Sequence, residues 1–154
     1  MTEPATDSTD AGANENRSGR EVTVFRDRSV SYLELPATDP AVMADFYEAV
    51  FGWEIRSENR SSFTDGSGHV IGHFIRDLKP SGETGPRPFV YVDGFDNALR
   101  AVETHGGQVV RPKYVEGNLW VATFRDPSGN VVGLWELIPE PGTRGLSPQD
   151  AVRT

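Results

Sequence analysis

The hydrophobic and polar positions change period several times in the first half of this chain. Residues 29–35 alternate, which is typical of a strand with one buried face. Asp39 and Pro40 then fit the N-cap and first position of a helix, and apolar residues recur at helical spacing over 42–51, up to Gly52. Three shorter strand-like segments follow: 53–57, 61–64 and 69–76. This half therefore predicts the order βαβββ.

The second half repeats that order. A linker rich in Gly, Pro and Ser occupies residues 79–88. A helical stripe at 95–105 ends at Gly106. One strand pattern precedes this helix and three follow it, at 89–92, 108–111, 119–124 and 131–137. The second half also predicts βαβββ.

Two ten-residue segments match in register, DGSGHVIGHF from Asp65 and DPSGNVVGLW from Asp126. They share the Asp, the Ser, a Val and two glycines. A repeat of this kind indicates two copies of one supersecondary unit. We therefore expect an α+β domain of two βαβββ modules, about residues 29–78 and 86–138. Their curved mixed sheets would enclose one cavity and carry the helices on their convex faces.

The two ends of the chain differ in composition from the body. Residues 1–20 contain no Val, Ile, Leu, Phe, Trp or Tyr, and residues 139–154 contain only Leu146 and Val152 from that set. Such segments bury too little apolar surface to offset the entropy of ordering. The sequence predicts disordered tails at 1–20 and 139–154 around a single domain at 21–138.

Charge and cysteine content exclude several classes of function. The formal net charge of −8 argues against nucleic acid and against anionic membrane surfaces as partners. The chain has no cysteine, which excludes disulfides, thiolate catalysis and Cys-type metal sites. No apolar run approaches the ~18 residues of a membrane span, and the first residues lack the apolar region of a secretory signal. We expect a cytoplasmic protein with a small-molecule partner.

Two segments carry a resemblance to a known family. LELPATDPAVMADFYEAVFGWEI (33–55) and FRDPSGNVVGLWE (124–136) resemble the Asp-capped helix and the Asp-Pro-x-Gly-Asn turn of the vicinal oxygen chelate superfamily. That superfamily includes glyoxalase I, bleomycin-resistance proteins, fosfomycin-resistance enzymes, extradiol dioxygenases and methylmalonyl-CoA epimerase. The resemblance implies the fold and, because two-module members often pair, a homodimer. It does not imply one activity, because members differ in chemistry and some only bind.

The resemblance also implies where a divalent metal would bind. Metal-dependent members carry His, Glu or Gln on the first and last strand of each module. These positions fall here on Tyr32, Gly72, Arg87 and Gly133. Glycine has no donor side chain and arginine cannot coordinate a cation. A one-residue slip would bring in only His73 and Leu134. We therefore expect no metal or other cofactor at the family positions, and a metal held elsewhere stays an alternative.

Strand parity assigns side chains to the expected cavity. The assigned set is Tyr32 with Glu34, Phe74 with Gly72, Arg87 with Phe89 and Tyr91, Trp135 with Gly133, and Trp120 from a neighbouring strand. These residues predict an aromatic cavity in which the two glycines leave room for a flat ligand. Glu34 is the candidate acid or base if the aromatic side chains bury it. The same aromatic residues would equally fill an ordinary closed core.

Three functions fit these observations. The leading one is a metal-independent binder, similar to bleomycin-resistance proteins, for a planar or aromatic metabolite or drug. The second is a lyase, isomerase or hydroxylase-type enzyme of the same superfamily that uses Glu34 or a metal held in another way. The third is a structural or regulatory module with a closed cavity.

Overall fold

The computed structural model describes residues 23–140, and it confirms the predicted α+β architecture of two similar modules. Nearly all of the tails predicted at 1–20 and 139–154 lies outside the described residues. The first module contains β1 (Tyr32–Pro36), α1 (Pro40–Phe51), β2 (Glu54–Ile55), β3 (Ser62–Thr64) and β4 (Ile71–Ile75). The second contains β5 (Phe89–Tyr91), α2 (Phe95–Thr104), β6 (Gln108–Glu116), β7 (Leu119–Arg125) and β8 (Val131–Leu137).

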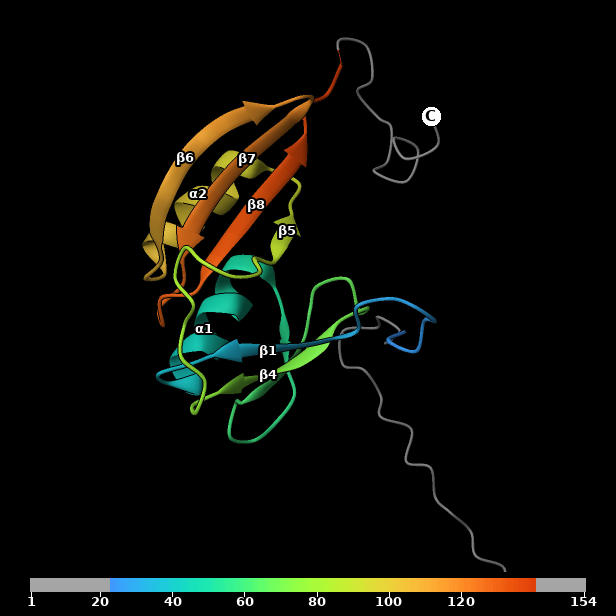
Figure 1. Ribbon diagram of the computed structural model, residues 1–154, viewed down its shortest axis with the longest axis vertical. Coiled ribbons are helices and arrows are strands. Elements are labelled where there is room, and N and C mark those ends of the chain that lie inside the picture. Colours follow the sequence, from blue (N-terminus) through green and yellow to red (C-terminus); the bar gives the residue numbers. More distant parts are fainter. Residues whose placement is uncertain (1–22, 141–154) are drawn as a thin grey trace, which may run out of the picture.

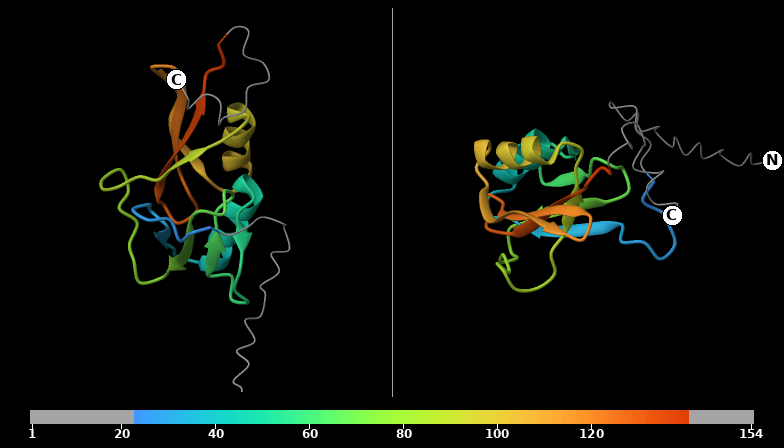
Figure 2. Two further views of the ribbon diagram at one scale, coloured as in Figure 1. Left: turned by 90° about the vertical axis from the view of Figure 1, so that its right-hand side faces the viewer. Right: turned by 90° about the horizontal axis from the view of Figure 1, so that it is seen from above.

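Each module forms a four-stranded mixed sheet with the same topology. The strand orders are β1-β4-β3-β2 and β5-β8-β7-β6 (Figure 1). In both sheets the first strand pairs in parallel with the last, and the remaining pairs are antiparallel. Seen from above, both helices lie on one side of the molecule, while the linker between the modules projects from the other side (Figure 2). Each sheet therefore has one face that a helix covers and one face that is free of helices.

Helix α1 begins and ends as its sequence predicts. The Asp39 carboxylate accepts a hydrogen bond from the Ala41 amide at 3.0 Å, and Pro40 occupies the first turn. Gly52 ends the helix in the left-handed conformation at φ 65°, where a residue without a Cβ is favoured. The apolar face of α1 packs on the first sheet, and Met43 and Phe46 are almost completely buried.

Helix α2 takes its cap from a distant strand. Gly94 has no side chain to accept the first amides of the helix, and Glu136 at the end of β8 accepts them instead. Its two carboxylate oxygens receive the Gly94 and Phe95 amides at 3.1 and 2.8 Å. A carboxylate at a helix N-terminus also interacts favourably with the helix dipole. This contact fixes α2 against β8 and leaves the neighbouring Asp93 without a capping role.

Strand β6 is longer than the 108–111 segment that the sequence predicts. It continues through Pro112 to Glu116, with register shifts between Val109 and Arg111 and between Arg111 and Tyr114. Proline cannot donate to a sheet ladder and is tolerated at edges and bulges. Because β6 is the edge strand of its sheet, Pro112 interrupts the pairing without ending the strand.

The two modules share one hydrophobic core. Phe46 and Phe51 of α1 lie within 6.0 and 6.1 Å of the Phe124 ring on β7. The Tyr47 ring stacks on Trp53 and on Phe74, with ring centroids 4.4 and 5.9 Å apart. Contact between the modules therefore runs through α1 and the helix-facing side of both sheets.

A buried carboxylate lies at the centre of this contact. Asp126, in the turn between β7 and β8, accepts hydrogen bonds from the Tyr47 hydroxyl at 2.9 Å and from the Asn130 amide group at 2.8 Å. The same Asn130 group donates to the Pro36 carbonyl of β1 at 2.7 Å, and the Thr38 amide donates to the Ser128 hydroxyl at 3.0 Å. We call this set the 126–130 junction. It joins the last turn of module two to the end of β1 and to α1 of module one.

Burial raises the pKa values of both ionisable side chains of this junction, Asp126 and Tyr47. Burial raises the pKa of Asp126, although the hydrogen bonds from Asn130 and Tyr47 oppose that rise. Burial and the adjacent Asp126 carboxylate raise the pKa of the Tyr47 phenol well above its usual value. Tyr47 therefore remains a hydrogen-bond donor, which the buried carboxylate needs.

We predict that Tyr47→Phe lowers the free energy of unfolding at pH 8 by about 1.5–3 kcal/mol, because it removes a hydrogen bond to a buried charge. Urea denaturation measures this loss. The matched control is Tyr114→Phe, whose hydroxyl donates to Glu116 on the exposed edge strand, and it should change stability by less than about 0.5 kcal/mol. Because the Tyr47 hydrogen bond lowers the pKa of Asp126 by favouring its charged form, the Tyr47→Phe deficit should shrink once acidification protonates that carboxyl. Equal effects of the two substitutions at pH 8 would contradict this role.

Candidate functional site

An open cleft of about 800 Å³ lies between the two modules. On one side it is lined by β1, α1 and the turn at residues 65–70. On the other side it is lined by β5 and the first half of α2. Its walls are mostly apolar and include Leu33, Phe51, Trp53, Val90 and Ala98. A concave, largely apolar site with a few polar groups is the usual form of a small-molecule site.

The cleft lies where the internal repeat would place a second copy of the 126–130 junction. Aligning Asp65 with Asp126, and Asp39 with Gly94, makes the 65–69 turn equivalent to the 126–130 turn. The same alignment makes Val102 equivalent to Tyr47, and Tyr91 equivalent to Pro36. The first turn and the β5–α2 segment do line the cleft. The contact between the modules is therefore formed at the 126–130 junction, and the equivalent contact at the 65–69 turn is replaced by the cleft.

Two substitutions and one hydrogen bond within the first turn explain why this second contact does not form. Val102 has no hydroxyl to bind Asp65. His69, at the position of Asn130, contacts Thr23 through its ring nitrogen at 2.8 Å. The Ser67 hydroxyl, at the position of Ser128, donates to the Asp65 carboxylate at 2.8 Å. The polar groups that would join the modules are missing or already satisfied within the first turn.

The expectation that Phe74 faces the cavity with Gly72 is wrong. Phe74 is almost fully buried on the helix side, where it contacts Tyr47 and Phe63. The cause lies in the turn: Asp126 donates its amide to the carbonyl of Asn130, whereas Asp65 donates to that of Val70. The first turn is thus one residue longer. Because side chains alternate along a strand, one residue reverses every face of β4 relative to β8.

The two glycines at family metal positions do not leave free space, contrary to expectation. A Cβ on Gly72 would meet the Leu33 carbonyl at 2.1 Å and the Phe63 ring at 2.4 Å. A Cβ on Gly133 would lie 2.1 Å from the Phe89 ring. In each module an aromatic ring from a neighbouring strand covers the glycine.

These positions do not fit a divalent metal. The Tyr32 hydroxyl hydrogen-bonds to His73, and Arg87 donates to the Glu83 carbonyl in the linker. Within residues 23–140, no three His, Cys, Asp or Glu side chains gather as a metal site requires.

The remaining predicted residues fall into separate groups. Phe89 and Tyr91 line the cleft, and Trp135 packs edge-on against Tyr91 at 4.9 Å. The expectation that Trp120 joins them is wrong, because it is paired with Glu136 on the α2 side of the sheet and lies under the Lys113 ammonium. Arg87 and Glu34 have no hydrogen bond or ion pair with each other in the described part of the chain.

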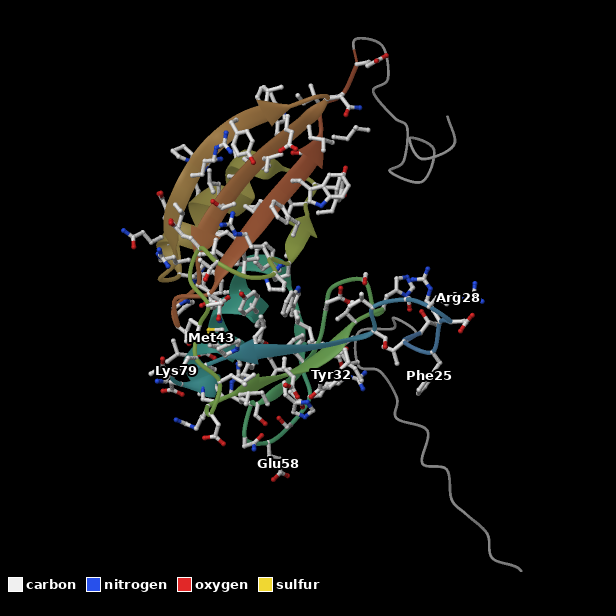
Figure 3. The ribbon with its side chains drawn as sticks, in the orientation of Figure 1. Phe25, Arg28, Tyr32, Met43, Glu58 and Lys79 are labelled. Carbon is white, nitrogen blue, oxygen red and sulfur yellow. The ribbon has the colours of Figure 1, made fainter. Side chains whose placement is uncertain are left out.

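Tyr32, Glu34 and His73 share the helix-free face of the first sheet. The Tyr32 hydroxyl and His73 Nδ1 are 2.8 Å apart, and Glu34 is paired with His73 across β1 and β4. Figure 3 shows Tyr32 beside these two strands, well away from Met43 on α1. All three side chains are exposed, so Glu34 is not the desolvated carboxyl that strong pKa tuning would require. His73 enters this face only because of the longer first turn.

Much of the cleft wall was missed in the sequence. Leu33, Val50, Phe51, Asp65 and Asp93 line the cleft, but none of them is among the residues that strand parity assigns to the cavity. One available signal was the mismatch of the repeat at Tyr47 and Val102. A polar residue facing an apolar one at equivalent buried positions indicates that one of the two contacts between the modules is absent.

Comparisons with known proteins agree with this geometry. The family model for the glyoxalase/bleomycin resistance protein/dioxygenase superfamily matches residues 29–134. The anthracycline biosynthesis protein DnrV of Streptomyces peucetius is 28% identical over 134 residues, which cover 74% of this chain and 49% of that protein. CFP32 of Mycobacterium bovis is 27% identical over 138 residues, 77% of this chain and 52% of that protein. This chain thus spans about half the length of these relatives.

Solved structures show the same fold at lower identity. The fosfomycin resistance protein FosX from Mesorhizobium loti superposes with a TM-score of 0.58 at 17% identity, over 79% of this chain and all of that one. TioX from Micromonospora sp. ML1 gives a TM-score of 0.55 at 21% identity, over 71% of this chain and 98% of that one.

We predict that alanine at the two covered glycines has unequal costs. Gly72→Ala places a Cβ against backbone between paired strands and against a buried ring, so it should destabilise the protein by about 3 kcal/mol or more. Gly133→Ala meets only the ring of Phe89, which is 46% exposed on an edge strand and can rotate away, so about 1 kcal/mol or less is expected. Urea unfolding of both variants measures the difference. A larger loss for Gly133→Ala would show that the ring of Phe89 is fixed in place.

Proposed function

This chain belongs to the glyoxalase/bleomycin resistance protein/dioxygenase superfamily, and from that premise we propose that it binds a small organic molecule in the cleft without a metal. The observation that carries the proposal is the open, mostly apolar cleft between the modules, together with the aromatic rings that cover the two glycines at family metal positions. An open cleft also counts against a module whose cavity is closed.

The wall of the cleft favours a planar or aromatic ligand. Phe89 and Tyr91 lie along one side, and Phe51 and Trp53 lie along the other. Stacking on such rings contributes ~0.5–1.5 kcal/mol per pair beyond the burial of apolar area. The name of DnrV associates that relative with anthracycline biosynthesis, which is in keeping with an organic ligand.

In this arrangement the cleft would select a ligand by its fit to the wall and would not catalyse a reaction on it. The apolar wall removes ligand surface from water, and the small side chains of Ala98 and Ala101 set the depth available on the α2 side. Neither of the two carboxylates among the cleft residues is buried: Asp93 is exposed, and Asp65 already accepts hydrogen bonds from its own turn. The cleft therefore suits sequestration or transport of a ligand better than its conversion.

A second function is favoured by the Tyr32, Glu34 and His73 group. A phenol hydrogen-bonded to an imidazole at 2.8 Å can pass a proton, and an adjacent carboxylate can support it. This would allow lyase or isomerase chemistry by proton transfer on the helix-free face of the first sheet. A homodimer and a cytoplasmic location also remain proposals. For the dimer, the support is exposed apolar side chains such as Phe25 at the tip of the segment before β1 (Figure 3).

The described residues contain no helix that is long and apolar enough to cross a membrane.

We predict that filling the cleft abolishes binding. In a screen of planar aromatic compounds, ligands should alter the fluorescence of Trp53, which lines the cleft, and Ala98→Phe should weaken their binding at least about tenfold by occupying the same volume. Ala49→Phe is the matched control, because Ala49 is exposed on α1 and does not line the cleft. If Ala98→Phe folds normally and binds ligands as the wild type does, the cleft is not the site.

We predict that turnover, if the second function holds, depends on the sheet face rather than on the cleft. Metal-stripped protein would then convert a substrate by lyase or isomerase chemistry. His73→Gln should lower kcat by about 10²-fold or more, as expected for loss of an acid–base group. Ala98→Phe should leave kcat unchanged. Turnover that needs an added divalent ion, or that survives His73→Gln, would exclude this mechanism.

A further inference from the structure

The charged groups of the cleft all have one sign. Its lining contains the carboxylates of Asp65 and Asp93 and, among the described residues, no Lys, Arg or His side chain. Polar residues from both modules accompany them, with Ser67 beside Asp65 and Asn97 near Asp93. The remaining lining is largely apolar. The cleft therefore combines a hydrophobic wall with an acidic polar part.

Asp93 has no structural task that would explain its charge. It precedes Gly94, the N-cap of α2, yet Glu136 from β8 accepts the first amides of that helix. Within residues 23–140, no hydrogen bond or ion pair engages the Asp93 carboxylate. Burial raises the pKa of Tyr91, and the charge of Asp93, two residues further along the chain, adds to that rise.

Asp65 differs from Asp93 because its turn uses it. Its carboxylate accepts the Ser67 hydroxyl and the Gly68 amide at 2.8 and 3.0 Å, while the carboxyl remains part of the cleft lining. Those donors leave its net negative charge in place. In the repeat, Ser67 is equivalent to Ser128 and Asp93 is equivalent to Thr38. Ser128 and Thr38 are in direct contact, because the Thr38 amide donates to the Ser128 hydroxyl. Asp65 and Asp93 thus line the same cleft from different modules.

We propose that the cleft takes an organic cation, a planar or apolar molecule that carries a basic nitrogen, with Asp93 and Asp65 receiving the positive charge and the apolar wall receiving the ring system. This inference rests on the proposed function and adds the charge class of its ligand. An anionic ligand would meet two carboxylates and, among the described lining residues, no compensating cation, so the Coulombic interaction opposes its binding. A neutral ligand gains from the wall but makes no use of the unpaired Asp93.

A matched pair of dyes separates charge from shape. Both 9-aminoacridine and acridine are planar tricyclic molecules, but at pH 8 the first is a cation and the second is neutral. Dissociation constants for both are measured by fluorescence titration against the wild type, Asp93→Asn, Asp65→Asn and Ala98→Phe. The control Asp77→Asn makes the same change in net charge at an exposed residue that does not line the cleft.

The cation should bind about tenfold more tightly than acridine, as a charge-assisted contact predicts. Asp93→Asn should remove most of that preference, Asp65→Asn should remove less of it, and Asp77→Asn should keep it. The preference should also weaken at high salt, since Asp93 is exposed and its charge is screened. Ala98→Phe should weaken the binding of both dyes.

Other results overturn the inference in distinguishable ways. If both dyes bind equally, lose affinity in Ala98→Phe and are unaffected by Asp93→Asn, the cation preference is refuted and the proposed small-molecule site stands. If Asp77→Asn has the same effect as Asp93→Asn, the preference comes from the overall charge of −8 and not from the cleft. If neither dye binds, the organic-cation proposal fails, and the wider screen with Ala98→Phe decides the proposed function.

Discussion

A buried carboxylate that must be satisfied determines how the two modules meet. Asp126 is almost completely buried, and leaving such a charge without donors would cost several kcal/mol. Its donors come from its own turn and from Tyr47 on the first module. Because Asn130 also holds the end of β1, the position of one side chain fixes a strand, a helix and a turn from different halves of the chain. The shared aromatic core then packs around this fixed contact.

The candidate binding site follows from the absence of a second contact of the same kind. A chain with two exact repeats would close both sides of the interface and have no space between its modules. Here Val102 replaces the hydroxyl of Tyr47, and the Ser67 hydroxyl is used within its own turn. The contact fails on that side, and the cleft remains. Sequence divergence between the repeats thus creates the hollow, while the intact junction opposite supplies the rigidity that a preformed site needs.

The helix-free faces of the sheets serve a different role from the one that the family pattern implies. In the second sheet Phe89 occupies the space over Gly133 on the helix-free face, whereas in the first sheet Gly72 faces the helix side, where Phe63 covers it. The longer first turn brings His73 beside Tyr32 and removes Phe74 into the core. The molecule therefore offers two chemically distinct surfaces, an apolar acidic cleft for binding and an exposed phenol–imidazole pair with proton-transfer capacity.

The sequence by itself determined the two modules, both helices with their ends, and the absence of usable side chains at the family metal positions. These features depend on local periodicity, capping residues and a repeat, all of which are properties of short segments. Only the tertiary structure decided which face Phe74 occupies, because one additional residue in a turn reverses the whole of β4. It placed Trp120, which is paired with Glu136, on the α2 side of its sheet. It also decided where the hollow lies, because that depends on whether Tyr47 and Val102, more than 50 residues apart, find partners in the other module.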